Sequence, residues 1–229
     1  MDIVDEDING FMMAVHKMDR SKGLDLFLHT PGGEIAAAES LVHYLRKMFG
    51  NDIRAIVPQI AMSAGTMISC ACKSVVMSKH SNLGPIDPEI AGIPAAAVQE
   101  EFERAIKEIN EDQGRLAGWQ FILSKYTPTY LAKCENAVQW SKTFVDQALK
   151  KNMLSELEDS EAEQTAAKIV DRLSDFSGNK SHSRHIHCDE VRELGIVVET
   201  LEDDQELQDR VLTVHRSEER RVGKECFLL

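Results

Sequence analysis

Two short stretches, HTPGGE at residues 29–34 and IAMSAGT at residues 60–66, decide how the rest of the chain is interpreted. Each follows an apolar run, at 24–28 and 53–57, whose length is typical of a buried strand. Between them, from residue 35 to 48, apolar side chains recur every three to four positions, which predicts a helix. Strand, helix and strand at this spacing predict a βαβ unit in a parallel sheet.

The same alternation continues along the chain and is interrupted by a long helical insertion. A short apolar helix is expected at 64–71, a third strand at 74–77 and a last strand at 196–199. Other helices are expected at 95–116, 129–153, 160–173 and 189–194, with a polar loop at 176–180. The predicted fold class is α/β: one domain over residues 1–201, with a parallel β-sheet core of βαβ units and a helical arm over about 95–175.

Composition narrows the class of protein. The chain has 229 residues, of which 43% are hydrophobic and 28% charged, as in ordinary globular proteins. Its formal net charge of −12 argues against nucleic-acid binding, because nothing would neutralise the phosphates. The 5 cysteines are irregularly spaced and contain no Cys-x-x-Cys, which favours reduced thiols in a cytoplasmic protein.

Both ends of the chain carry expectations of their own. We expect neither a signal peptide, since residues 1–7 are acidic, nor a membrane span, since no apolar run reaches about 18 residues. The chain enters its first element almost at once, so a first strand is expected to be missing, and any membrane association would come through a missing N-terminal segment. Residues 202–215 are expected to form an acidic tail. Residues 216–229 resemble the conceptual translation of a common DNA-sequencing adapter and are excluded from the fold prediction.

Ser63 is the candidate nucleophile. A serine hydroxyl needs a sharp turn that presents it, donors for the developing oxyanion and a base. Ser63 lies between a strand and the helix that begins at Ala64, whose free N–H groups favour negative charge nearby. The adjacent Gly32 and Gly33 follow the preceding strand and allow backbone N–H groups to face a cavity without a Cβ in the way. Taken singly, each feature favours a purely structural interpretation, with Ser63 as a helix N-cap and the two glycines as a turn.

The two motifs together, in this order and separation, resemble the superfamily of the Clp protease proteolytic subunit, signal peptide peptidase A and crotonase. The stretch SNLGPIDP at residues 81–88 is similar to a segment of the serine dehydrogenase proteinase family within that superfamily. The resemblance implies a ClpP/crotonase-like fold and a serine endopeptidase that acts on peptide or protein substrates without a cofactor. It also implies that Ser63 is acylated, that Gly32 and Gly33 line the oxyanion hole, and that Gly33 and Ala64 supply the backbone donors. Peptidases of this superfamily assemble into rings or stacks, which implies a homo-oligomer built partly through the arm.

The general base departs from the family pattern, because no histidine lies near residues 85–87, where Clp peptidases carry one. One alternative is a triad in which His182 or His185 is the base and Asp87 the acid, with their chain order exchanged. His80 lies slightly before the expected place. Lys107 could form a serine–lysine dyad, but only if burial lowered its pKa, and its acidic neighbours would raise it. The last alternative is that the base is lost.

Other functions remain open at this stage. The histidines between 182 and 187, with Cys188, lack the spacing and partner pair of a metal site, so no metal is expected. A crotonase-type acyl-CoA enzyme would need a glutamate and no serine at the helix start. A non-catalytic scaffold or peptide-binding protein would keep the fold and the oligomer without the chemistry. An ATPase or membrane partner is not readable from the sequence.

Overall fold

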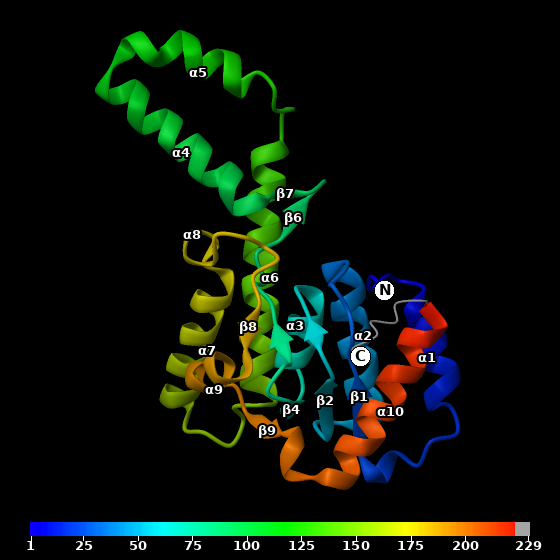
Figure 1. Cartoon of the computed structure of the whole chain (residues 1–229). Helices are drawn as coiled ribbons and strands as arrows, with labels where there is room; N and C mark the ends of the chain where they lie inside the picture. The colour runs from blue at the N-terminus through cyan, green and yellow to red at the C-terminus, as the bar shows by residue number, and fades with distance from the viewer. Residues whose placement is uncertain (223–229) are drawn as a thin grey trace, which may run out of the picture.

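The computed structural model describes residues 1–222, with side chains described through residue 217, and its core is a parallel sheet. Four strands stand in the spatial order β1-β2-β4-β9 and all neighbours are parallel (Figure 1). They are β1 (Leu24–Phe27), β2 (Ile53–Val57), β4 (Ser74–Met77) and β9 (Val198–Thr200). The predicted α/β class and parallel sheet are confirmed.

Helices cover both faces of this sheet. Along β2, Ala55 and Val57 join the large core with helices α2 (Ile35–Phe49) and α3 (Ala64–Cys70). Ile56, between them, points to the other face because side chains alternate along a strand. There it packs with Val211 of α10 (Gln205–Val222).

The stretch 202–215, expected to be an acidic tail, is therefore part of the folded domain. It forms η3 (Leu201–Asp203) and most of α10, and its acidic residues lie on the solvent side of an amphipathic helix. The charge pattern suggested a tail, but the apolar residues at helical spacing cover a sheet face that would otherwise be exposed. Residues 216–222 continue the helix, while the rest of the segment that resembles an adapter lies outside the described residues.

A second, smaller sheet joins three distant segments. β3 (Ile60–Ala61) pairs parallel with β5 (Asn82–Leu83), and β5 pairs antiparallel with β8 (Ile186–His187). Each strand has only two residues, too few for a periodic pattern, and the sequence did not predict them. This sheet brings the segments around Ser63, Asp87 and His182 to one end of the core.

A helical arm projects from the body, as Figure 1 shows for α4 (Ala95–Glu111) and α5 (Leu116–Leu123). It starts after the hairpin of β6 (Glu89–Ile90) and β7 (Ile93–Pro94) and has its own small core. The expected helix at 95–116 ends earlier, at Glu111, and η2 (Gln113–Arg115) turns the chain into α5. The long helix α6 (Tyr130–Lys151) returns to the body.

The remaining elements are α1 (Asp7–Val15), η1 (Arg20–Lys22), α7 (Asp159–Ser174), α8 (Phe176–Asn179) and α9 (Cys188–Leu194). The segment 176–180, expected to be a loop, contains the single turn α8. Within residues 1–222, no helix is both long and apolar enough to cross a bilayer. The four described cysteines are free and buried, and burial raises the pKa of Cys70 and of Cys72 to about 12, which makes both thiols unreactive.

Candidate active site

Ser63 stands at a strained turn between β3 and α3. Its φ of 49° and ψ of −114° lie in a region that residues with a side chain rarely adopt, so packing around the turn must hold it there. The flanking Met62 and Ala64 are buried, which supplies that constraint. Ser63 occupies the N-cap position of α3, but its hydroxyl makes no capping hydrogen bond. The capping interpretation therefore does not account for this serine.

Gly32 packs directly against Ser63. A Cβ on Gly32 would lie 2.9 Å from Ser63 Cβ and 3.5 Å from Ser63 Oγ. Its φ of 128° and that of 149° at Gly33 are conformations that glycine alone adopts readily. Both glycines are therefore required by the geometry, which brings the HTPGGE loop against the serine.

The N–H group of Gly33 points away from the N-terminal segment around Ile3, which pairs with the glycine loop. In a parallel bridge, Ile3 donates to the carbonyl of Gly32 (2.8 Å) and accepts from the N–H of Glu34 (2.9 Å). Because successive peptide groups alternate in direction, the N–H of Gly33 points to the opposite side. Among the described residues, neither this N–H nor that of Ala64 donates a hydrogen bond. Both donors remain available to a bound oxyanion.

Two buried threonines that were not among the candidates from the sequence hold these loops together. Thr30 Oγ1 accepts from the N–H of Gly32 at 3.1 Å, and the backbone of Thr30 forms a parallel bridge to Ala61. On the other side of the serine, Thr66 Oγ1 accepts from the N–H of Gly84 at 2.9 Å and contacts the carbonyl of Ala61 at 2.8 Å. Each threonine lies within three residues of a site residue. That proximity was the only signal in the sequence.

His182 and Asp87 form a pair. His182 Nδ1 lies 3.1 Å from Asp87 Oδ1, and the side-chain exposures are 19% and 2%. Burial by itself lowers the pKa of His182, but the hydrogen bond and charge of Asp87, with the charge of Glu89, outweigh it and raise the pKa above its usual value. A buried carboxylate that binds one imidazole nitrogen orients the ring and stabilises its protonated form.

The segment that carries Asp87 is fixed from both sides. The N–H of Ile86 donates to the carbonyl of Leu173 on α7 at 2.9 Å. The hydroxyl of Ser141, on α6, donates to the carbonyl of Ile86 at 2.6 Å. Asp87 therefore keeps its place through α6, which returns from the arm, and through α7, which follows α6 along the chain.

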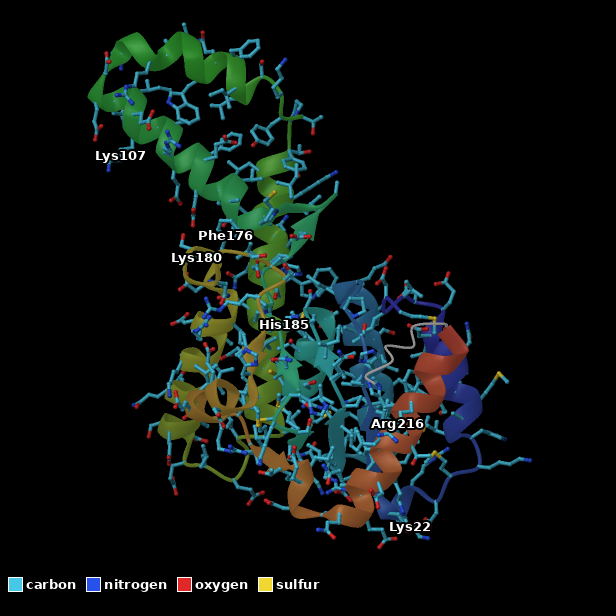
Figure 2. All side chains as sticks on the ribbon, in the orientation of Figure 1. Lys22, Lys107, Phe176, Lys180, His185 and Arg216 are labelled. Atoms are coloured by element: carbon cyan, nitrogen blue, oxygen red, sulfur yellow. The ribbon has the colours of Figure 1, made fainter. Side chains whose placement is uncertain are left out.

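The other candidate bases lie elsewhere. His185 is exposed and makes no side-chain hydrogen bond within residues 1–222. His80 is exposed and contacts Ser78 Oγ at 3.0 Å. Lys107 is exposed on α4, and Figure 2 shows it on the arm, well apart from His185 at the body. His182 is the candidate paired with a buried carboxylate, although no hydrogen bond joins it to Ser63.

An open cleft of about 360 Å³ lies beside Ser63, which is within the size range of sites for small ligands and single side chains. The loop after β1, helices α2, α3 and α6, and the segment before the arm all contribute to it. Its lining residues are Gly33, Glu34, Ile35, Ala36, Ser63, Met67, Ile86, Pro88, Glu89, Ala137 and Trp140.

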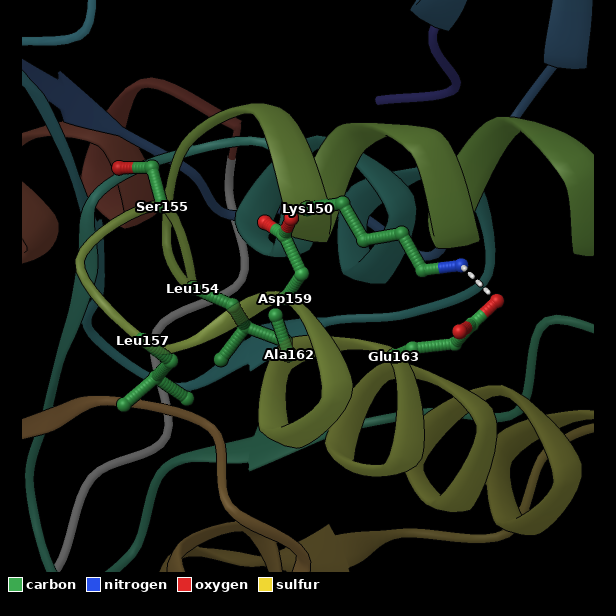
Figure 3. A pocket seen from close by; sticks show the side chains of 7 residues that line it. All are labelled: Lys150, Leu154, Ser155, Leu157, Asp159, Ala162 and Glu163. Carbon is green, nitrogen blue, oxygen red and sulfur yellow. Dashed lines mark ion pairs between the residues drawn. The ribbon is translucent and has the colours of Figure 1, made fainter.

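A different cavity, of about 280 Å³, lies between the end of α6 and the start of α7 (Figure 3). Lys150 and Glu163 border it and form an ion pair at 4.0 Å. Ser155 lines this cavity, but neither Ser63 nor any of the other site residues does. Nor do three or more His, Cys, Asp or Glu side chains gather as metal ligands would anywhere among the side chains that the structure describes, those of residues 1–217.

Comparison with known protein families identifies the family to which the chain belongs. The family described as "ClpP-like SDH-type serine proteinase" matches residues 1–211, nearly the whole described chain. The chain belongs to this family. Membership confirms the family resemblance inferred from HTPGGE, IAMSAGT and SNLGPIDP and makes the chain a member of a serine-proteinase family, while the roles of its individual residues rest on the geometry above.

Two curated relatives come from Methanocaldococcus jannaschii. The uncharacterized protein MJ0137 is 30% identical over 195 residues, which cover 85% of this chain and 60% of the relative. The uncharacterized protein MJ1495 is 27% identical over 195 residues, covering 85% and 58%. The chain thus spans about three-fifths of the length of these relatives. A solved structure of a mutant of the 1510-N membrane-bound stomatin-specific protease aligns with 87% of this chain and 92% of its own, at 16% identity and a TM-score of 0.35.

Proposed function

We propose that this chain is a serine endopeptidase domain that cleaves peptide bonds through an acyl-enzyme on Ser63. The Ser63 hydroxyl attacks the carbonyl carbon of a peptide bond in the adjacent cleft. The N–H groups of Gly33 and Ala64 donate to the oxygen as it becomes negative, and the N-terminus of α3 adds a favourable dipole. No metal or organic cofactor takes part in these steps.

His182 is the proposed general base, with Asp87 as its partner. Nδ1 of the imidazole is bound to Asp87, which leaves Nε2 to take the proton of Ser63 and return it to the leaving amine. A water molecule that gives a proton to the same imidazole then attacks the acyl carbon, the ester bond to Ser63 breaks, and the serine recovers its proton as the carboxylic acid product leaves. The hydrogen bond between base and serine is expected to form with substrate bound, since such bonds are often long in empty sites.

The observation that carries this proposal is the contact between Gly32 and Ser63. It places Ser63, which has a strained backbone and a hydroxyl that makes no capping hydrogen bond, against a loop that requires glycine. The N–H groups of Gly33 and Ala64 and an open cleft lie next to it. A serine that served only as a helix cap would need none of these features. A crotonase-type enzyme would not need the serine at all.

A fluorophosphonate probe tests the nucleophile directly. We expect stoichiometric labelling of the wild-type chain at Ser63 and none of Ser63→Ala. Ser69→Ala is the matched control, because Ser69 lies on the same helix with its hydroxyl bonded to the carbonyl of Gly65 at 2.8 Å, and labelling should persist there. A wild-type chain that binds peptides but resists the probe would instead identify a non-catalytic binding protein.

We further propose that the domain acts as a homo-oligomer through its arm. The distal arm exposes large apolar side chains, with Ile106 at 63% and Phe121 at 68% exposure. Exposed apolar groups that gather on one projection are typical of association surfaces.

A further inference from the structure

The cleft beside Ser63 combines an apolar floor with an acidic rim. Met67 of α3 and Ile86 are almost fully buried and form a fixed floor. Trp140 of α6 forms part of the wall. Glu34 and Glu89, from the loops on either side, are exposed and line the same cleft. A bound side chain would therefore meet apolar atoms below and carboxylates at the entrance.

Trp140 is held in a fixed orientation at this wall. Its indole Nε1 donates to Glu39 Oε2 on α2 at 2.9 Å, which ties the ring to the neighbouring helix. The side chain is still 42% exposed, so part of its surface remains accessible from the cleft. A rigid aromatic wall loses little entropy on binding and favours an apolar side chain over a polar one.

Among the described residues, no lysine or arginine neutralises the acidic rim, and the cationic group that interacts with it is the imidazole of His182, whose pKa the charge of Glu89 helps to raise. Within the described part of the chain, neither Glu34 nor Glu89 forms an ion pair, and no lysine or arginine lines the cleft. The net charge of −12 adds to the negative potential around it. An uncompensated carboxylate at the entrance of a binding site favours a ligand with positive charge there.

We propose that this cleft selects peptides in which a residue next to the scissile bond has an apolar side chain. Lysine or arginine directly follows or precedes that apolar residue in the peptide. The apolar side chain packs on Met67, Ile86 and Trp140, and the neighbouring cation lies at the rim with Glu34 and Glu89. The inference rests on the proposed function, because Ser63 defines which peptide bond is the scissile one.

The effect of each carboxylate is expected to be modest. Exposed ion pairs are weak, so each carboxylate should change affinity by about twofold to fivefold, and the preference should shrink as salt rises. Replacing the apolar side chain by serine should cost more, about tenfold or greater, because the contact with the floor is lost.

The test uses six short peptides. Each has leucine or serine next to the scissile bond, and lysine, glutamine or glutamate as the neighbour of that residue. Affinity is measured by calorimetry on the Ser63→Ala chain, and kcat/KM on the wild-type chain. We expect the leucine–lysine peptide to be best in both measurements, and the glutamate peptide to be worst within the leucine series and within the serine series. In Glu34→Gln/Glu89→Gln the order of lysine, glutamine and glutamate should disappear, while the preference for leucine over serine remains.

Glu158→Gln is the matched control, since Glu158 is an exposed carboxylate outside the cleft and its loss should leave the lysine preference intact. A lysine preference that survives in the double variant, or equal affinity for the lysine and glutamate peptides, would overturn the inference. Failure of the proposed function looks different: the wild-type chain would then fail to hydrolyse any peptide, while the binding order on Ser63→Ala would still support the selectivity of the cleft.

Discussion

At the scale of single residues, the site depends on the absence of a side chain at position 32. Gly32→Ala would place a Cβ 2.9 Å from Ser63 Cβ, in a backbone conformation that alanine avoids. Since a displacement of about 1 Å can reduce catalysis about 100-fold, we expect the rate of fluorophosphonate labelling to fall by at least that factor.

Gly50→Ala provides the control for backbone strain. Gly50 also has a positive φ, of 65°, but no atom lies within 4 Å of a Cβ placed there. Gly50→Ala should be destabilised by about 1 kcal/mol while keeping its labelling rate. Equal labelling losses in both variants would mean that Gly32 contributes only to folding.

His182, as the proposed general base, determines how kcat/KM should depend on pH. As a general base it acts only when neutral, and its pKa is raised above the ordinary value of about 6.5. The acid limb of kcat/KM should therefore lie above that pH. Glu89→Gln removes one of the charges that raise the pKa, so the limb should shift to lower pH, as a pH–rate profile would detect. An unshifted limb would assign the base to another group.

The same raised pKa predicts how stability changes with pH. The His182–Asp87 pair stabilises the fold fully below the unfolded-state pKa of about 6.5, and this contribution is lost as pH rises through the raised folded-state pKa. The free energy of unfolding of His182→Gln should thus fall below that of the wild type by more in acid than in alkali. Urea denaturation at several pH values measures it, and a difference that grows with pH would contradict the assigned direction.

At the scale of elements, α10 is needed to cover the second face of the sheet. Val211 packs against Ile56 and Val76 and is 4% exposed, whereas Val214 on the same helix is 47% exposed. Val211→Ala should lower the free energy of unfolding by about 1–3 kcal/mol, and Val214→Ala by less than about 0.5 kcal/mol. Chemical denaturation compares them. Equal effects would mean that the helix does not dock as described.

The small sheet of β3, β5 and β8 shows why elements at the site were hard to predict. Strands of two residues have no periodicity, and one of their two pairings, between Asn82–Leu83 and Ile186–His187, joins segments more than 100 positions apart along the chain. The long elements of the core were predicted within a few residues because each buries a stripe or face of its own. The parts that carry chemistry are loops held by those elements.

At the scale of the whole molecule, the arm should mediate self-association. Phe121→Glu and Ile106→Glu place charges on its exposed apolar surface and should reduce the mass measured by light scattering. Leu157→Glu is the control, because Leu157 is also exposed, at 37%, but lies between α6 and α7 in the body and not on the projecting helices α4 and α5. An unchanged mass in the arm variants, with a wild-type oligomer present, would place the interface elsewhere.

The sequence by itself determined the α/β class, the order of βαβ units, the family, and the linked positions of Gly32, Gly33 and Ser63. These follow from local patterns: hydrophobic periodicity, glycines next to strand ends and a serine before an apolar helix. The tertiary structure decided that His182 is hydrogen-bonded to Asp87, whereas His185, His80 and Lys107 are not. It also decided that residues 202–215 cover one face of the sheet and that Trp140 and two glutamates border the cleft beside Ser63. These depend on contacts between residues far apart in the chain, and no local pattern records which distant side chains a parallel sheet and a returning helix will bring together.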